Sequence, residues 1–169
     1  MTAGCHEDAA DHLSLADRRH PPDGGGCGSR RSHGTGYSGA AGLTATEANG
    51  ADVLAADGYI FASPENLAAL AGRMKDFFDR TYYAVLDRIN GRPYATLVCA
   101  GSDGENAARQ IARIATGWRL RAIADPLIVC TRAQRPEAIL APKLIGPAEL
   151  DRCAELGATF AAGLATGVF

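Results

Sequence analysis

Residues 57–80, DGYIFASPENLAALAGRMKDFFDR, carry the clearest indication of the fold of this chain. Residues 59–61 form a short apolar run typical of a buried strand, and Pro64 should end that strand because proline cannot donate to a sheet ladder. Apolar residues then recur at steps of three and four, which predicts a helix from about Asn66 to Arg80. A strand that leads into a helix is half of a βαβ unit, and open α/β sheets bind ligands at the carboxyl ends of their strands. The loop at 63–66 is therefore a candidate binding loop.

The segments that follow continue the alternation of strands and helices. They are a short helical or turn segment at 46–56 before the first strand, then a strand at 94–100, a helix at 105–116, a strand at 126–130, a loop at 132–142 and a helix from 147 to about 164. The run YATLVCA at 94–100 is continuous and apolar, as in parallel strands that are buried on both faces. This order predicts an α/β fold with a parallel sheet and right-handed crossovers.

Composition excludes several classes of protein. A length of 169 residues favours one domain, and a net charge of -2 offers no basic surplus for nucleic acid. No apolar run approaches the roughly 20 residues that span a bilayer. The five cysteines are widely spread and include no CxxC pair, which fits reduced thiols. We therefore expect a cytoplasmic protein with no membrane or nucleic-acid partner.

Residues 1–44 differ in character from residues 45–169, which we expect to form the folded domain. Residues 1–52 contain no Val, Ile, Phe or Trp, and nine of the twenty glycines lie in the first 42 residues. The simplest interpretation is an irregular or disordered segment with too little apolar area to fold. A metal site is an alternative, but the spacing of the candidate ligands matches no compact zinc pattern. Those ligands are Cys5, His6, His12, His20, Cys27 and His33.

A third interpretation is that residues from about Cys5 to Thr44 are translated out of frame. If the codons permitted for residues 9–23 are read one base later, one permitted translation is LLIIYHSLTGGTRQM, which describes a buried strand, a Ser/Thr/Gly loop and a helix start. Residues 29–43 can similarly be read as a helix end followed by an apolar strand. The sequence as written predicts only three strands, and the two restored strands would complete a five-stranded sheet. The coding DNA decides this hypothesis.

Three pieces of the chain resemble the flavodoxin-like family of FMN-binding proteins and NAD(P)H-dependent FMN reductases. They are ADGYIFASPEN at 56–66, LAGRMKDFFDR at 70–80 and LVCAGSDGENA at 97–107. The resemblance covers roughly residues 45–165 and implies a three-layer, doubly wound parallel sheet whose N-terminal strands are degraded or missing here. It also implies FMN as the cofactor and NADH or NADPH as the electron donor.

In that family three loops at the strand ends hold FMN. The phosphate loop, which binds through backbone N–H groups at a helix N-terminus, is legible here only in the shifted frame. The other two loops correspond to the cofactor-binding candidates Ser63, Pro64, Glu65 and Asn66, and Ala100, Gly101, Ser102 and Gly104. The sequence departs from the family pattern at Leu67, where many relatives carry an aromatic residue that stacks on the ring, and at Ala62, where glycine is common.

The same residues also have structural interpretations. Asn66 is a good helix N-cap, and Gly101 and Gly104 could simply be turn glycines. No Ser/His/Asp or Cys/His set exists in residues 45–169, so the sequence offers no catalytic side chain of the hydrolase type. No metal ligands are assigned.

Three functions remain open at this point. The first is an NAD(P)H-dependent FMN or quinone-type reductase that acts on a small-molecule acceptor, with a homodimer implied by the resemblance. The second is a non-enzymatic flavodoxin-type electron carrier, although carriers tend to be more acidic than this chain. The third is a cofactor-free or defective flavodoxin-fold protein that lacks the phosphate loop.

Overall fold

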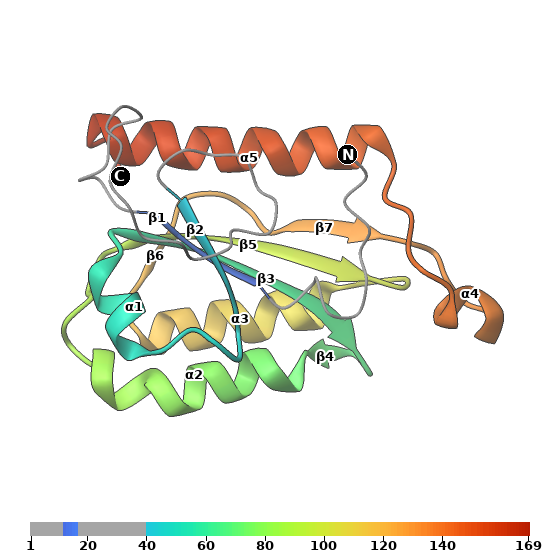
Figure 1. The fold of residues 1–169 in the computed structure, drawn as a ribbon, viewed down its shortest axis with the longest axis horizontal. Helices are drawn as coiled ribbons and strands as arrows, with labels where there is room; N and C mark the ends of the chain where they lie inside the picture. Colours follow the sequence, from blue (N-terminus) through green and yellow to red (C-terminus); the bar gives the residue numbers. More distant parts are fainter. Residues whose placement is uncertain (1–11, 17–39) are drawn as a thin grey trace.

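A computed structural model describes residues 12–16 and 40–169 of the chain (Figure 1). Its neighbouring strands follow the order β2-β1-β3-β5-β6, with β4 paired to β3 and β7 paired to β5. The strands are β1 (His12–Ala16), β2 (Ala40–Thr44), β3 (Gly58–Asn66), β4 (Ala69–Leu70), β5 (Pro93–Ala100), β6 (Arg121–Ala122) and β7 (Leu127–Cys130). The helices are α1 (Gly50–Ala55), α2 (Gly72–Val85), α3 (Glu105–Gly117), α4 (Pro136–Leu140) and α5 (Pro147–Thr166).

The central part of the sheet is parallel, as the sequence predicts. Strand β5 pairs in parallel with β3 on one side and with β6 and β7 on the other. The two N-terminal strands complete the sheet, but β1 runs antiparallel to both β2 and β3. The predicted flavodoxin-like α/β class is therefore confirmed, with a parallel-dominated sheet in place of an entirely parallel one.

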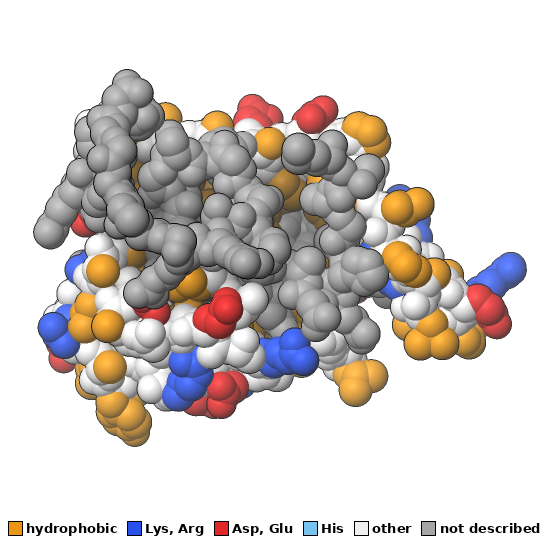
Figure 2. All heavy atoms as spheres, in the orientation of Figure 1, with side chains coloured by type: hydrophobic (Ala, Val, Ile, Leu, Met, Phe, Trp, Pro, Cys, Tyr) orange, Lys and Arg blue, Asp and Glu red, His pale blue; other side chains and the backbone are white. Residues whose placement is uncertain are grey.

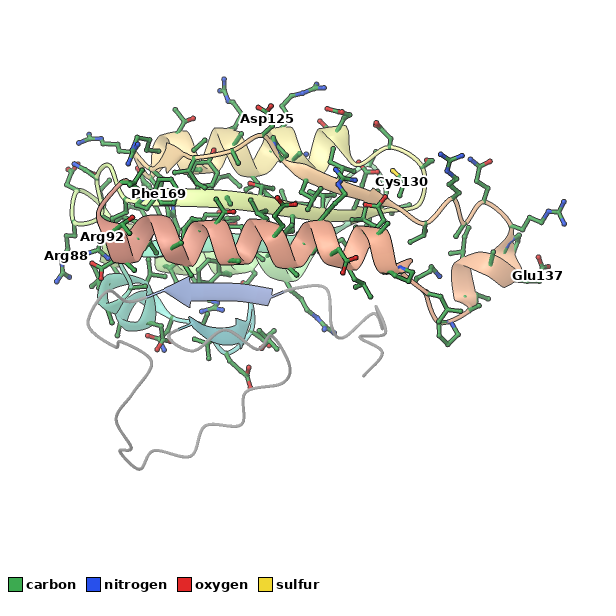
Figure 3. The ribbon with its side chains drawn as sticks, turned by 90° about the horizontal axis from the view of Figure 1, so that it is seen from above. Arg88, Arg92, Asp125, Cys130, Glu137 and Phe169 are labelled. Carbon is green, nitrogen blue, oxygen red and sulfur yellow. The ribbon has the colours of Figure 1, made fainter. Side chains whose placement is uncertain are left out.

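Helices cover both faces of the sheet and make three layers (Figure 1). Helices α1, α2 and α3 lie on one face, where they enclose the larger apolar core, and α5 lies along the other face. The second, smaller core is formed by Ala95, Phe160 and Leu164, so it joins β5 to α5. Figure 3 shows α5 running the length of the sheet, with Phe169 at its far end.

An aromatic cluster lies at the centre of the larger core. The ring of Phe61 on β3 lies 5.0 Å from that of Phe78 on α2 and 6.3 Å from that of Trp118, centroid to centroid. Both pairs are edge-to-face, a favourable arrangement for aromatic rings. The cluster holds α2 and the end of α3 against β3, and so fixes the position of the loop that follows β3.

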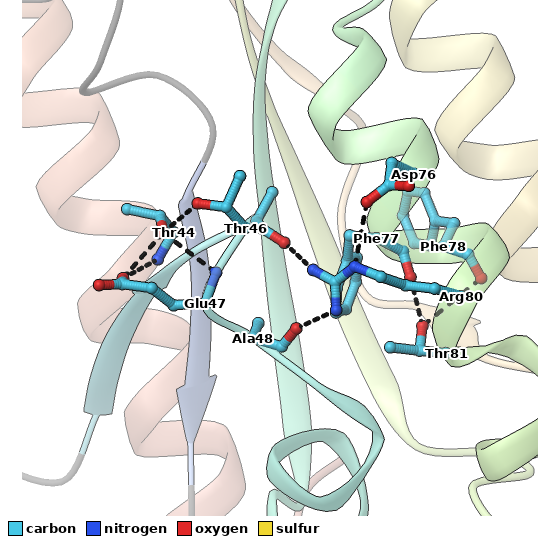
Figure 4. A network of polar contacts seen from close by, with 10 residues as sticks. Thr44, Thr46, Glu47, Ala48, Asp76, Phe77, Phe78, Arg80 and Thr81 are labelled. Atoms are coloured by element: carbon cyan, nitrogen blue, oxygen red, sulfur yellow. Dashed lines mark hydrogen bonds and ion pairs between the residues drawn. The ribbon is translucent and has the colours of Figure 1, made fainter.

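Arg80 anchors α2 to the segment before α1 (Figure 4). Its guanidinium donates to the carbonyl oxygens of Ala45 and Ala48, and its Nε lies 3.1 Å from a carboxylate oxygen of Asp76 one turn earlier. Helix α1 begins as predicted within residues 46–56, at a capping box in which the Asn49 side chain accepts from the N–H of Asp52. These contacts bring the connection between β2 and β3 onto the helical layer.

Two predicted boundaries were wrong, and one predicted loop contains a helix. Strand β3 does not end at Pro64 but continues to Asn66 and turns back into β4, and α2 begins at Gly72 rather than near Asn66. Pro64 is the last residue of β3 to pair with β5, so its missing N–H falls where the strand changes partner. The predicted loop at 132–142 contains α4.

The hydropathy of the helices agrees with this arrangement. None of the helices within the described ranges, 12–16 and 40–169, has a span both long and apolar enough to cross a membrane.

Candidate functional site

The two candidate loops lie side by side at the carboxyl edge of the sheet. In the parallel pairing of β3 with β5, Ser63 is opposite Val98 and Pro64 is opposite Cys99, so the ends of both strands are level. The backbone N–H of Gly104, in the loop after β5, donates to Oε2 of Glu65 at 2.9 Å. The structure therefore brings the predicted residues of both loops together.

The loop after β3 is a tight hairpin, which the sequence did not predict. Glu65 and Asn66 pair with Leu70 and Ala69, and the two residues between them, Leu67 and Ala68, have φ angles of 50° and 59°. Two consecutive left-handed residues are the geometry of a type I′ turn, which normally uses Asn and Gly. Asn66 is accordingly an exposed strand residue and not the N-cap of α2; that position belongs to Ala71.

Ser63 is used by the fold itself. Its side chain is buried, its hydroxyl accepts from the N–H of Ala71 at 3.1 Å, and it donates to the carbonyl oxygen of Pro64 at 3.0 Å. Ala71 is the N-cap of α2, and its side chain makes no capping hydrogen bond. Ser63 therefore satisfies one of the free N–H groups at that helix start from across the hairpin. Ser63 is thus the candidate residue whose side chain stabilises the loop through hydrogen bonds within the fold.

Glu65 is the most informative polar side chain of the site. One carboxylate oxygen, Oε2, accepts from Gly104, while the other, Oε1, is buried and finds no hydrogen-bond partner in the part of the chain that the structure describes. An unpaired buried acceptor is costly unless a donor reaches it. Glu65 therefore links the two loops and also offers a free acceptor at their junction.

Helix α3 holds the hairpin through two side chains that sequence reasoning missed. Asn106 donates from Nδ2 to the carbonyl oxygen of Ala68 at 2.5 Å, and Oε1 of Gln110 accepts from the N–H of Leu70 at 3.0 Å. The two residues are four positions apart, on one face of the first turns of α3. In the sequence, the only indication of this role was that the two polar residues stand next to Ala107 and Ile111, which the structure shows to be buried.

The loop after β5 combines buried and exposed residues. Ala100 and Gly104 are buried, Gly101 is half-buried and Ser102 is exposed. Gly104 has a φ of 84°, and a Cβ there would lie 2.6 Å from Cγ2 of Ile128. Its missing side chain therefore serves the packing of α3 against β7. A Cβ on Gly101 would meet nothing closer than 3.4 Å.

Cys130, at the end of β7, lies beside the same loop. It is exposed, in contrast to the buried position that its apolar strand suggests, and its Sγ lies 3.6 Å from the carbonyl oxygen of Asp103. No group of three or more His, Cys, Asp or Glu residues close enough to hold a metal occurs within residues 12–16 and 40–169. The proposed ligands among the first 33 residues lie outside that description, except for the backbone of His12.

The perturbed phenols lie at the opposite edge of the sheet. Burial raises the pKa of Tyr59, against the opposing effect of the Arg92 guanidinium 3.0 Å from its hydroxyl, and burial also raises the pKa of Tyr94. Both residues are near the amino ends of their strands, and Tyr59 donates to the carbonyl oxygen of Val53. They belong to the core and not to the candidate site.

The described residues suit part of an FMN molecule. Free polar groups at the two loops, above all Oε1 of Glu65 and the exposed side chains of Asn66 and Ser102, match the hydrogen-bonding edge of a flavin ring. The phosphate loop implied by the resemblance corresponds to residues that lie almost wholly outside the description. The polar groups of the two loops therefore fit the ring half of the cofactor.

Comparison with known proteins supports the same family. No curated protein matches the chain. The family model of the NADPH-dependent FMN reductases matches residues 11–132, a range that starts and ends earlier than the one we inferred from motifs and that includes both candidate loops. Because the match covers well over half of the 169 residues, the chain belongs to the NADPH-dependent FMN reductase family.

Proposed function

We propose that the chain is an FMN-dependent oxidoreductase that takes electrons from NADPH or NADH and delivers them to a small-molecule acceptor such as a quinone. The observation that carries the proposal is the bond between Glu65 and Gly104, which joins two loops at the carboxyl edge of the sheet in a chain of this family. That edge is where open α/β sheets bind their ligands. A cytoplasmic location and a homodimer are part of the proposal.

Each residue of the site has a role in binding rather than in proton transfer. FMN, when bound, supplies the chemistry, because its ring accepts a hydride from the nicotinamide. Oε1 of Glu65 would accept from an N–H group on the ring edge, and the side chains of Asn66 and Ser102 would bond its carbonyl oxygens. Pro64, Ala100 and Gly101 would border the ring with small or rigid groups. No general base is required.

The phosphate half of the site leads to a quantitative expectation. Charge-assisted hydrogen bonds contribute about 1.5–3 kcal/mol each, so the loss of three or four phosphate contacts would cost on the order of 5–10 kcal/mol. At about 1.4 kcal/mol per tenfold, FMN affinity would fall by several decades. If residues 5–44 are out of frame, the chain as written binds FMN weakly or not at all, and a version restored from the coding DNA binds it tightly.

Reduction of the flavin by the nicotinamide separates a reductase from an electron carrier. NADPH or NADH is added without oxygen to the FMN-loaded protein, and the yellow absorbance of the oxidised flavin is followed. A reductase bleaches with the nicotinamide, and adding a quinone restores the colour. A protein that bleaches only with dithionite is a carrier, and that result would overturn the enzymatic proposal.

A matched pair of asparagines tests the site itself. Asn66 and Asn90 are both exposed, but Asn66 is at the candidate site and Asn90 is in the turn before β5, at the opposite edge of the sheet. Asn66→Ala should weaken FMN binding by about 2- to 10-fold, the worth of one neutral hydrogen bond, while Asn90→Ala leaves it unchanged. Equal effects of the two substitutions would place the ring elsewhere.

A further inference from the structure

The segment that follows β7 lies along the candidate loop after β5. The N–H of Thr131 donates to the carbonyl oxygen of Ala100 at 2.8 Å, and the Thr131 hydroxyl donates to the same oxygen at 3.2 Å. A Cβ added to Gly101 would lie 3.4 Å from the carbonyl oxygen of Ala133. Because β7 pairs with β5 in parallel, residues 130–133 form a third loop at the carboxyl edge of the sheet, on the side of β5 away from β3.

Arg132 stands in the middle of this third loop in a conformation that arginine disfavours. Its φ is 56°, in the left-handed region that glycine and asparagine normally occupy. The other arginine with a positive φ among the described residues, Arg119, has its guanidinium in an ion pair with Asp87. Arg132 is exposed, and its guanidinium has no ion pair or hydrogen bond with any residue of 12–16 or 40–169. Strained residues of this kind cluster at functional sites.

The third loop is basic. Residues 130–135 include two arginines and no acidic residue, and Arg135 is exposed and, within the described ranges, has no ion-pair partner either. Figure 2 shows basic side chains on the protruding segment that contains α4, which this loop leads into. The guanidinium group binds phosphate, carboxylate and sulfonate groups through paired N–H donors. The loop is therefore suited to an anionic group at the border of the candidate site.

We propose that Arg132, assisted by Arg135, binds an anionic group of the substrate whose ring lies on the two candidate loops. The inference rests on the proposed function, because it adds a third loop to the same site. Two substrates of that reaction carry such a group. One is NADPH, whose 2′-phosphate NADH lacks, and the other is an acceptor that bears an acid group, in contrast to a neutral quinone. Arg132 is then a specificity-determining residue that distinguishes the charged member of each pair.

Isothermal titration calorimetry of the full chain with two matched pairs of probes tests the anion site. The first pair is 2′-phospho-ADP-ribose, which is NADPH without its nicotinamide, and ADP-ribose. The second pair is anthraquinone-2-sulfonate and the uncharged 2-(hydroxymethyl)anthraquinone, with FMN in excess. The charged member should bind about 10-fold more tightly in at least one pair, the worth of one charge-assisted hydrogen bond. A preference in the first pair assigns the site to the donor, and one in the second pair alone assigns it to the acceptor.

Four variants connect this preference to Arg132. Arg132→Asn removes the charge and suits the left-handed φ, so it should abolish the preference without lowering the melting temperature. Arg132→Lys keeps the charge without the planar fork and should retain part of the preference. Asp103→Asn removes a carboxylate from the loop whose backbone lies beside Cys130, and should tighten binding of the charged probes by about 2-fold. The control Arg121→Gln removes an exposed arginine at the opposite edge of the sheet and should change nothing.

The outcomes separate this inference from the proposed function. Equal affinity for both members of both pairs, or a preference that Arg132→Asn leaves intact, would overturn the anion site. FMN binding is measured on the same samples by flavin fluorescence. A chain that binds FMN but shows no charge preference removes only this inference. A chain that binds no FMN but distinguishes the two nucleotides through Arg132 removes only the proposed cofactor.

Discussion

Gly104→Ala should destabilise the fold and disturb the junction of the two loops. Alanine at a φ of 84° costs about 1–2 kcal/mol, and its Cβ would lie 2.6 Å from Cγ2 of Ile128 and 3.2 Å from Cβ of Ala100. Overpacking of that kind costs about 1–3 kcal/mol, while the loss of glycine freedom in the unfolded chain returns about 0.4–1 kcal/mol. The free energy of unfolding should therefore fall by about 1–5 kcal/mol.

Urea unfolding followed by the fluorescence of the single tryptophan, Trp118, measures this change. Gly101→Ala is the matched control, because its Cβ would meet nothing closer than 3.4 Å and its φ is not positive; it should stay within about 0.5 kcal/mol of the wild type. In an Ile128→Ala background Gly104→Ala should cost at least about 1 kcal/mol less, since the closest steric contact, that with Cγ2 of Ile128, is removed. Equal stability of the two glycine variants would show that neither the φ of Gly104 nor its approach to Ile128 limits the residue at that position.

Three further outcomes follow from the core and the helix anchors. Burial raises the pKa of Tyr59 in the folded state, so the free energy of unfolding should fall as the pH rises above about 10. In urea titrations at several pH values, Tyr59→Phe should reduce this pH dependence, whereas the control Tyr83→Phe should leave it unchanged. Arg80→Ala should lower the free energy of unfolding by about 1.5–3 kcal/mol, because its hydrogen bonds to the two carbonyl oxygens are lost. Lys75→Ala, which removes an exposed ion pair on the same helix, should lower it by under about 0.5 kcal/mol. Equal losses for the two variants would contradict the anchoring role of Arg80. Ser63→Ala should cost about 1 kcal/mol in thermal unfolding because it leaves the N–H of Ala71 unsatisfied, and an unchanged melting temperature would contradict this.

Much of the fold could be predicted because residues 45–169 alternate clear apolar strands with amphipathic helices. The run at 94–100 became β5, the helix predicted at 105–116 became α3, and the helix that begins at Pro147 became α5. In each case local propensity, hydrophobic period and end signals agree, which is the condition under which sequence reasoning succeeds. The antiparallel direction of β1 was not predicted, since residues 1–44 show no strand period.

The hairpin after β3 could not be predicted from local rules. Leu67 and Leu70 fit the helical period of the residues that follow, yet Leu67 is exposed in a turn and Leu70 is buried in β4. Leu and Ala give no signal for a left-handed turn, because glycine and asparagine are the residues that normally adopt it. Tertiary bonds from Asn106 and Gln110 impose the turn, and such contacts are not visible in a sequence pattern.

The candidate site was likewise predictable from the sequence only in part. The strand-to-helix pattern placed the loop at 63–66 at the carboxyl edge of the sheet, and the family resemblance added the loop at 100–104. In the structure the two loops lie together at that edge. The bond between Glu65 and Gly104 and the capping role of Ser63 depend on exact side-chain positions, so only the structure could reveal them. The roles of these residues in cofactor binding stay predictions. So does the division of the chain at residue 44.

Flavin binding by the chain as written and by a frame-restored version tests whether the chain carries a ring site but lacks the phosphate loop of an FMN site. Fluorescence titrations compare FMN with riboflavin, which has the same ring but no phosphate. The chain as written should bind both weakly and with dissociation constants within about threefold of each other, whereas the restored chain should prefer FMN by at least about 100-fold, equivalent to about 2.8 kcal/mol. A chain as written that prefers FMN by 100-fold, or a restored chain that does not distinguish the two, would contradict the account.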